Sequence, residues 1–180
     1  MKKIKKTIIL LLLSSASVFS QFNEIHIGGG IGIGEISGNS PSQSAYSNSI
    51  FIGLKHTSTG DIIFRVNYIY ASKINSILPE NRTGKYYPFQ HIFAVTGSMN
   101  QNISSFYLQG GIGPLLIQDR IFAGEIEIDF GLMLSAGFYM TAFSFTDSKI
   151  DFGITGNFGE TFTNSLASFY LYQINFVYFP

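Results

Sequence analysis

The last thirteen residues of the chain, 168–180, constrain its fold more than any other stretch. Every second residue from Tyr170 to Tyr178 is aromatic or aliphatic, while the interleaved positions are mixed and include two amides. An alternation with a period of two residues predicts a β-strand with one apolar face. At the end of a soluble chain, an exposed strand this aromatic would invite edge pairing and aggregation. A membrane barrel needs such a strand, because its outer face meets lipid and its last strand closes onto its first.

The first twenty residues predict an export signal. Four lysines precede a run of isoleucines and leucines at 8–13, and small residues lead up to position 21. This order is typical of a secretory signal peptide, so we expect residues 1–20 to be removed. An uncleaved anchor is the alternative, but the apolar run is shorter than the roughly 20 residues that a spanning helix needs. Residues 21–180 then form one exported domain without cysteines for disulfide bonds.

The composition of residues 21–180 narrows the possible partners and folds. This part of the chain keeps seven basic and eleven acidic residues, a net charge of −4. A mildly acidic domain lacks the excess of positive charge that attracts nucleic acid, so no nucleic-acid partner is expected. Apolar residues make up 46% of the sequence, yet beyond residue 20 no stretch of 18 residues is continuously apolar. Hydrophobicity that alternates in this way is typical of a transmembrane barrel.

The alternation recurs along the whole exported part. It predicts strands at 22–35, 49–57, 62–72, 89–99, 104–113, 125–138, 149–158 and 168–180. We expect Pro114 to end the fifth strand, because proline cannot donate to a central ladder. Eight is an even number, as a single-chain bacterial barrel requires. The sequence therefore predicts an all-β fold, an eight-stranded antiparallel up-and-down transmembrane β-barrel that follows a cleaved signal peptide.

The predicted connections alternate between long and short. With both termini in the periplasm, the long loops would all be extracellular and the short turns would all be periplasmic. The predicted long loops are 36–48, 73–88, 114–124 and 159–165, and the short turns are 57–61, 100–102 and 141–148. A soluble lipocalin-like barrel or sandwich is the competing fold, with its apolar face turned inward around a core or ligand. The glycine-rich second face and the aromatic terminal strand argue against it.

By the alternation, six charged side chains face the lumen. They are the bases Lys55 and Arg65 and the acids Glu24, Glu127, Asp129 and Asp151. Buried charges of both signs are expected to pair, because an unpaired charge is costly at low dielectric. An eight-stranded barrel has an interior just wide enough for side chains, so a lumen filled by ion pairs is favoured over a polar channel. The glycines of the first strand would leave room for the long lysine and arginine side chains.

The motifs that could carry chemistry are weak. His56 and Ser58 resemble the His-x-Ser pair of outer-membrane lipid A deacylases, with Asp61 as a conceivable acid. The pair lies in a turn expected on the periplasmic side, whereas lipid A lies in the outer leaflet, so ordinary turn residues explain it better. The glycines at 28–34 lack the spacing of a phosphate loop, and His91 is expected at the membrane interface. We predict no catalytic site, cofactor or metal, and no enzyme.

The signal peptide, the eight alternating strands and the final aromatic strand resemble the small outer-membrane barrel family, which includes OmpX and the transmembrane part of OmpA. The resemblance covers residues 21–180, but it lies in the alternation of apolar and polar residues rather than in any specific sequence motif. In that family the last strand is a recognition signal for the barrel assembly machinery. The matching residues here are Tyr172, Phe176, Tyr178 and Phe179, and Pro180 departs from the pattern by following the terminal aromatic.

This resemblance implies a location in the cell outer membrane, with membrane lipid and the assembly machinery as partners. It also implies a structural or surface-interaction role for the barrel, with an extracellular ligand that the sequence does not identify. A lipid-modifying hydrolase and a narrow pore are the alternatives within the membrane. A soluble periplasmic ligand-binding barrel is the alternative outside it.

Overall fold

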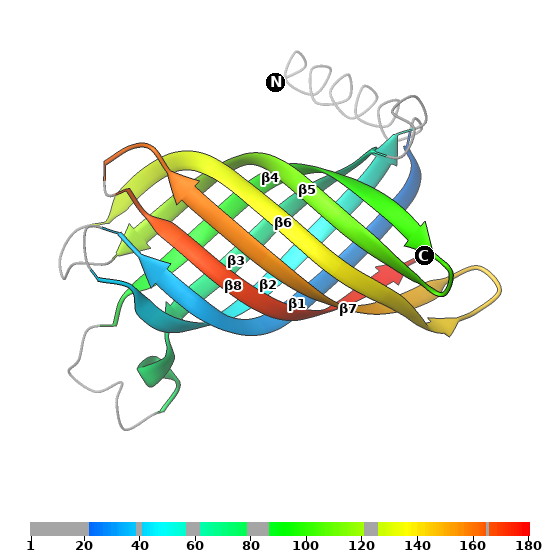
Figure 1. Cartoon of the computed structure of the whole chain (residues 1–180), viewed down its shortest axis with the longest axis horizontal. Coiled ribbons are helices and arrows are strands. Elements are labelled where there is room, and N and C mark those ends of the chain that lie inside the picture. The colour runs from blue at the N-terminus through cyan, green and yellow to red at the C-terminus, as the bar shows by residue number, and fades with distance from the viewer. Residues whose placement is uncertain (1–21, 39–40, 57–61, 79–86, 121–125, 165) are drawn as a thin grey trace, which may run out of the picture.

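The computed structural model describes residues 22–38, 41–56, 62–78, 87–120, 126–164 and 166–180, and the predicted signal peptide lies outside these ranges. Antiparallel strands form a closed barrel in chain order, and β8 pairs with β1 to complete it (Figure 1). The elements are β1 (Phe22–Ser37), β2 (Gln43–His56), β3 (Ile62–Lys73), the 3-10 helix η1 (Ile74–Ile77), β4 (Phe89–Ile103), β5 (Phe106–Arg120), β6 (Glu127–Ser144), β7 (Lys149–Thr161) and β8 (Ser168–Phe179). The predicted eight-stranded up-and-down fold is confirmed.

The connections lie at two opposite ends of the barrel (Figure 1). The β1–β2, β3–β4, β5–β6 and β7–β8 connections share one end, which we call the long-loop end. The other three connections and the C-terminus share the opposite end, the short-turn end. In the part of the chain that the structure describes, no helix is long and apolar enough to cross a membrane.

Several strands extend further than the sequence predicts. β2 begins at Gln43, so most of the predicted loop 36–48 is strand, and β5 continues to Arg120 through much of the predicted loop 114–124. The predicted turn 100–102 is also wrong, because β4 runs to Ile103 and only two residues join it to Phe106. The stretches 43–48 and 100–102 are rich in serine, asparagine and glutamine, so their alternation is weak although their backbones continue the ladder. The extension of β5 was missed because Pro114 was expected to end the strand.

Pro114 lies inside β5 and does not end it. The register between β4 and β5 is the same on both sides of the proline, but Gly113 and Pro114 themselves make no ladder pair with β4. On its other edge, Pro114 stays paired with Leu132 of β6. The missing N–H therefore interrupts one ladder locally, and the strand continues because the neighbouring pairs on both sides hold its register.

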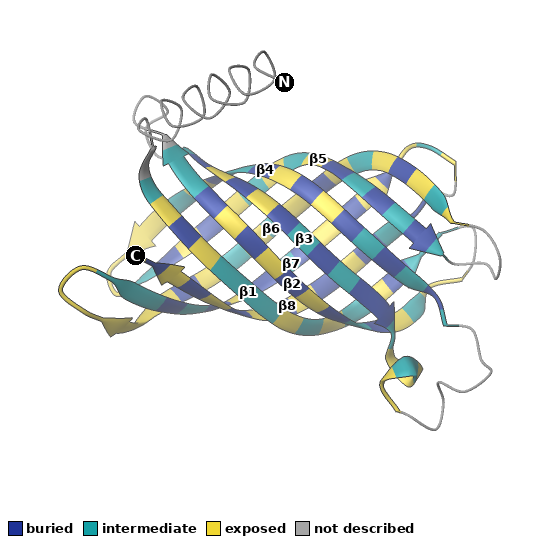
Figure 2. Ribbon diagram, turned by 180° about the vertical axis from the view of Figure 1, so that it is seen from behind, coloured by how far each residue is buried: buried dark blue, intermediate teal, exposed yellow. Residues whose placement is uncertain are grey.

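The outer wall of the barrel is apolar. Exposed and buried positions alternate along each strand, as the yellow and blue bands show (Figure 2). The outward side chains include Ile31, Ile50, Phe130, Ile154 and Phe176, which are 55% to 65% exposed. A continuous apolar wall of this extent is unstable against water and stable against lipid. The barrel wall is therefore a transmembrane surface, with outward residues where the alternation predicts them.

Candidate functional site

The inward-facing side chains form three layers along the barrel axis. A single strand, β8, shows the order from the long-loop end to the short-turn end. Its buried residues begin with Phe169 and Leu171, continue with the amides Gln173 and Asn175, and end with Val177 and Phe179. We call these layers the apolar layer, the amide belt and the basal cluster.

Of the three layers, the apolar layer lies nearest the long-loop end. Its residues contact one another, and each is at most 3% exposed. They are Ile36, Ala45, Ile69, Ala71, Ile92, Ala94, Leu115, Ile117, Met133, Ala167, Phe169 and Leu171. Every strand except β7 contributes to this layer. A packed apolar layer of this kind excludes water and hydrated ions.

The amide belt is a chain of neutral hydrogen bonds across the middle of the lumen. Asn157 Nδ2 donates to Gln173 Oε1 over 3.1 Å, and Gln173 Nε2 donates to Ser47 Oγ over 3.0 Å. Asn175 Nδ2 donates to Thr155 Oγ1 over 2.7 Å. Thr155, Asn157, Gln173 and Asn175 line part of a cavity of about 10 Å³, which is about the space of one water molecule.

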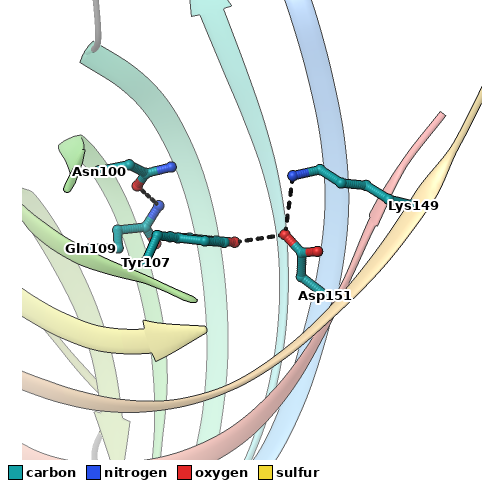
Figure 3. Close-up of polar contacts among 5 residues, drawn as sticks. All are labelled: Asn100, Tyr107, Gln109, Lys149 and Asp151. Atoms are coloured by element: carbon teal, nitrogen blue, oxygen red, sulfur yellow. Dashed lines mark hydrogen bonds and ion pairs between the residues drawn. The ribbon is translucent and has the colours of Figure 1, made fainter. Parts of the chain in front are cut away.

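The basal cluster is built around Asp151, which is fully buried. Its Oδ2 accepts a hydrogen bond from the Tyr107 hydroxyl over 3.0 Å and lies 3.3 Å from Lys149 Nζ (Figure 3). Nearby, Gln109 Nε2 donates to Asn100 Oδ1 over 2.8 Å (Figure 3). Charge-assisted hydrogen bonds such as these are stronger than neutral ones, and they offset part of the cost of burying the Asp151 carboxylate.

Aromatic rings separate the cations of the basal cluster. Arg65 Cζ lies 4.1 Å from the centre of the Phe51 ring, and Lys149 Nζ lies 4.0 Å from that of Phe179. The His26 ring fits between these two rings, at 6.3 Å from Phe51 and 4.9 Å from Phe179. Cation–π contacts of this kind offset part of the hydration that each cation loses on burial. They also keep the like charges of Arg65 and Lys149 apart.

A polar hollow of about 200 Å³ opens below the basal cluster at the short-turn end. Its lining includes Glu24, Lys55 and Lys149 together with the Tyr107 and Phe179 rings. Glu24 and Lys55 are direct cross-strand neighbours in the β1–β2 pair. The hollow carries charges of both signs, so it has no strong preference for an anion or a cation.

A second charged group lies at the opposite end, where Asp119, Glu127 and Asp129 bring their carboxylates together. Asp119 stands directly opposite Glu127 in the β5–β6 pair. Thr163, from the β7–β8 connection, donates from its Oγ1 to Asp129 Oδ1 over 2.9 Å. The hydroxyl also accepts a hydrogen bond from the Phe130 N–H over 2.9 Å.

All six predicted lumen charges lie on inward-facing positions, but at two separate ends. Glu127 and Asp129 belong to the long-loop end, and Lys55, Arg65, Glu24 and Asp151 belong to the short-turn end. The ion pair that holds Asp151 uses Lys149, which sequence reasoning did not include. The alternation could have found it, because residues two apart on a strand share a face.

Asp119 was also missed, because β5 was expected to end at Pro114. Extending the same alternation from residue 113 to residue 119 would have placed its side chain in the lumen next to Glu127. The glycines of β1 do leave room inside the barrel, but shorter side chains take it. A Cβ at Gly28 would lie 2.3 Å from Phe51 Cζ, and one at Gly30 would lie 2.1 Å from Asn175 Oδ1.

The residues of the hydrolase alternative are only partly described. His56 is the last residue of β2 at the short-turn end, while Ser58 and Asp61 lie outside the described residues. In the lumen, both ring nitrogens of the buried His26 lack a hydrogen-bond partner, so no hydroxyl nucleophile is bonded to it. His91 lies on the outer wall, where its Nδ1 is 2.8 Å from the Tyr68 hydroxyl.

The predicted assembly-signal residues face in two directions. Tyr172, Phe176 and Tyr178 lie on the outer wall and are 46% to 58% exposed, whereas Phe179 points into the basal cluster and is 7% exposed. The terminal aromatic therefore packs in the lumen while its neighbours meet the membrane.

A closed eight-stranded barrel with an apolar outer wall defines the class of transmembrane β-barrels. Neisserial surface protein A has a similar structure: the match covers 85% of this chain and 95% of that one at 12% identity, with a TM-score of 0.57. Ail, the attachment invasion locus protein of Yersinia pestis, matches over 87% of this chain and 98% of its own at 11% identity, with a TM-score of 0.55. A second structure of Ail, in complex with the heparin analogue sucrose octasulfate, gives a TM-score of 0.53.

No family model and no curated protein matches the sequence. The structural neighbours are small eight-stranded outer-membrane barrels of the OmpA/OmpX-like type, and this chain has their fold. The predicted fold resemblance is thereby confirmed. The fold and the apolar outer wall together place the chain in the outer membrane, as predicted.

Proposed function

We propose that this protein is an outer-membrane barrel with a structural or surface-interaction role, whose lumen is closed and whose long-loop end faces the cell exterior. The observation that carries the proposal is the apolar layer. Twelve buried apolar residues contact one another across the lumen, and the cavity below them holds about 10 Å³. A hydrated ion or solute would lose its water in such a layer, so transport is not favoured.

The connections at the long-loop end offer a contact surface. Ile77 and Leu78, at the end of η1, are 45% and 54% exposed, and Phe162 and Leu166 of the β7–β8 connection are 64% and 61% exposed. In Figure 1, η1 projects beyond the end of the barrel wall. Exposed apolar side chains outside the membrane are typical of sites that bind a protein or a lipid surface.

The names of the structural neighbours agree with a role at the cell surface, since one is a surface protein and the other an attachment protein. The heparin analogue bound to Ail is a polyanion. Residues 21–180 of this chain carry a net charge of −4, so electrostatics do not favour a similar ligand. Of the histidine rings that the structure describes, His26 has no hydrogen-bond partner and His91 is hydrogen-bonded only to the Tyr68 hydroxyl, without the acid that a hydrolase triad needs, so we propose no enzymatic role.

Conductance across a planar bilayer tests the closed lumen. The refolded protein is expected to give no stepwise conductance above that of the bilayer alone. A Phe169→Ala/Leu171→Ala variant removes two large side chains of the apolar layer and is expected to conduct. Large, stable channels in the unaltered protein would contradict the proposal and favour a pore.

Cysteine labelling tests the orientation, and the chain has no cysteine of its own. Ser42→Cys in the β1–β2 connection should react with an impermeant maleimide on intact cells. Asp147→Cys in the β6–β7 turn and Ser58→Cys in the β2–β3 turn should react only after the outer membrane is permeabilised. Labelling of the cysteine at position 58 on intact cells would reverse the orientation and return the His56–Ser58 pair to consideration as a hydrolase site.

A further inference from the structure

We propose that the outer wall of β2–β5 carries a binding site for one lipid A molecule of the outer leaflet. Four outward side chains that can form hydrogen bonds stand next to one another on adjacent strands. They are Asn48, Tyr70, His91 and Gln118, and each pairs with the next across the ladder. We call these four residues the polar row. The inference rests on the proposed function, in which the long-loop end faces the cell exterior.

The polar row faces the membrane rather than the lumen. On each of the four strands, the residues before and after its member are buried in the lumen, at 8% exposure or less. Successive side chains of a strand point to opposite faces, so the four members point outward. The row continues to Ile31 on β1 and to Ile128 on β6, both of which are exposed. The polar stretch is therefore set between apolar neighbours in the lipid-facing wall.

The two amides of the polar row need a polar partner. Asn48 is exposed, and within the described ranges no hydrogen bond is found to its side chain or to that of Gln118. An amide that meets hydrocarbon without a hydrogen bond is strongly unfavourable. The barrel leaves these two groups to be satisfied by the membrane, whose lipids offer carbonyl, hydroxyl and phosphate oxygens near the interface.

His91 is held in place for a contact with such oxygens. Its Nδ1 lies 2.8 Å from the Tyr68 hydroxyl, and the rings of Tyr70 and Phe89 have their centres 5.2 Å from that of the imidazole. When Tyr68 donates to Nδ1, the ring proton lies on Nε2, which is then a donor. Arg120 pairs with Phe89 in the next row toward the rim. Its five N–H donors can serve a phosphate together with a protein neighbour.

The polar row descends into the wall from the rim of the barrel. Gln118 lies two residues from the end of β5 at Arg120, whereas Asn48 lies five residues from the start of β2 at Gln43. Neighbouring strands lie about 4.8 Å apart and are tilted by about 40°, so each step along the row changes the depth by about 3 Å. The four members therefore cover about 9 Å of depth and about 14 Å of length.

The span of the polar row selects the lipid. A phospholipid carries its phosphate on a small headgroup, which two neighbouring members of the row would satisfy. Lipid A carries a phosphorylated disaccharide, and below its sugars lie the amide and ester carbonyls of its acyl chains. Polar groups that are distributed over both length and depth match a row that does the same. The side chains nearest the rim face the phosphorylated sugar, and Asn48 faces the acyl linkages.

A hollow on the outer wall adjoins the deep end of the polar row. Its volume is about 530 Å³, and its lining includes Asn48, Ile31 and Ile33. Tyr46 and Tyr172 also line it, and they pair with Ile33 from the two neighbouring strands. The hollow is continuous with the lipid-facing wall, so its occupant is an acyl chain. The polar row and the hollow together accommodate the polar and apolar parts of one lipid.

The test uses the full barrel in an uncharged detergent with added lipid A, and native mass spectrometry counts the bound lipid. One lipid A molecule should bind, and it should raise the unfolding temperature, because a ligand of the folded state stabilises it. The N48L/Q118L variant should bind lipid A at least about tenfold more weakly, since two hydrogen bonds are lost. Without lipid A, this variant should be as stable as the unaltered protein or more stable, because leucine suits a lipid-facing wall.

The matched control is Q101L, which removes an exposed amide of β4 near the short-turn end. It should keep the lipid A affinity of the unaltered protein. The absence of lipid A binding would overturn the site, and so would equal binding by N48L/Q118L. Equal binding of phosphatidylglycerol would overturn the assignment to lipid A.

Binding in detergent does not depend on the direction in which the barrel is inserted, so it tests the site separately from the proposed function. Cysteine labelling on intact cells tests the direction. A barrel that binds lipid A in detergent but labels in the reverse orientation would keep the chemistry of the site. It would overturn the assignment to the outer leaflet, because the polar row would then face the inner one.

Discussion

The contact between His26 and Gly53 gives a sharp test of how the basal cluster is packed. A Cβ added at Gly53 would lie 2.0 Å from His26 Nε2 and 2.1 Å from its Cε1. The imidazole has little space to retreat, because the ring of Phe179 lies 4.9 Å away on one side and that of Phe51 lies 6.3 Å away. Gly53→Ala therefore overpacks the lumen and should destabilise the barrel.

The size of the effect follows from a comparison with a second glycine. Gly110 has no atom within 4 Å of the position that its Cβ would take. Any Gly→Ala change at a compatible site stabilises a protein by about 0.4–1 kcal/mol through the unfolded chain. This gain is common to Gly53→Ala and Gly110→Ala, so their difference measures the overpacking alone. We expect Gly53→Ala to be less stable than Gly110→Ala by about 1–3 kcal/mol.

Urea unfolding in detergent micelles measures this difference as a shift in midpoint at constant slope. The His26→Ala/Gly53→Ala double variant provides the control for the mechanism. Once the imidazole is gone, adding Gly53→Ala should not lower the free energy of unfolding below that of His26→Ala alone. The coupling energy between the two substitutions should therefore be similar to the difference expected between Gly53→Ala and Gly110→Ala. Equal midpoints for Gly53→Ala and Gly110→Ala would refute the packing described for the basal cluster.

Three further substitutions test other parts of the lumen by the same unfolding measurement. Tyr107→Phe removes the hydroxyl that donates to buried Asp151 and should cost about 1–3 kcal/mol; Tyr178→Phe on the outer wall should be neutral, and equal effects would contradict the role of this hydrogen bond. Phe169→Ala empties part of the apolar layer and should cost about 3–5 kcal/mol; a loss below 1 kcal/mol would show that the layer is loosely packed. Arg65→Ala removes the guanidinium over the Phe51 ring and should lower stability by about 1–2 kcal/mol without a change in bilayer conductance, whereas increased conductance would indicate that Arg65 closes a pore.

The sequence predicts the fold because alternation alone sets which residues face lipid. In an antiparallel barrel, successive side chains point alternately outward and inward, whatever residues lie beside them. The outward orientation of residues such as Ile31 and Phe176 is therefore predicted by the alternation alone. The strand ends are harder to predict. The segment 43–48 has no regular apolar alternation, and only the continued pairing with β1 and β3 shows that it is strand.

The partners within the lumen could not be predicted, because they depend on contacts across the barrel. Alternation places Arg65 and Asp151 on the inner face, but it does not give their depths along the barrel axis or the groups that their side chains reach. In the structure Asp151 bonds Tyr107 and Lys149, while Arg65 lies over Phe51. An acid and a base several strands apart can share a face and still not meet. The separation of the charges into two ends is likewise a property of the closed barrel.

The most direct test of the account is heat modifiability of the protein in the native outer-membrane fraction. The fraction is run on SDS gels with and without boiling, and the chain is detected with an antibody. A closed barrel resists the detergent until it is heated, so the unboiled band should run faster than the boiled one. Recovery of the chain in the soluble periplasm, with no change in mobility on boiling, would contradict a transmembrane barrel.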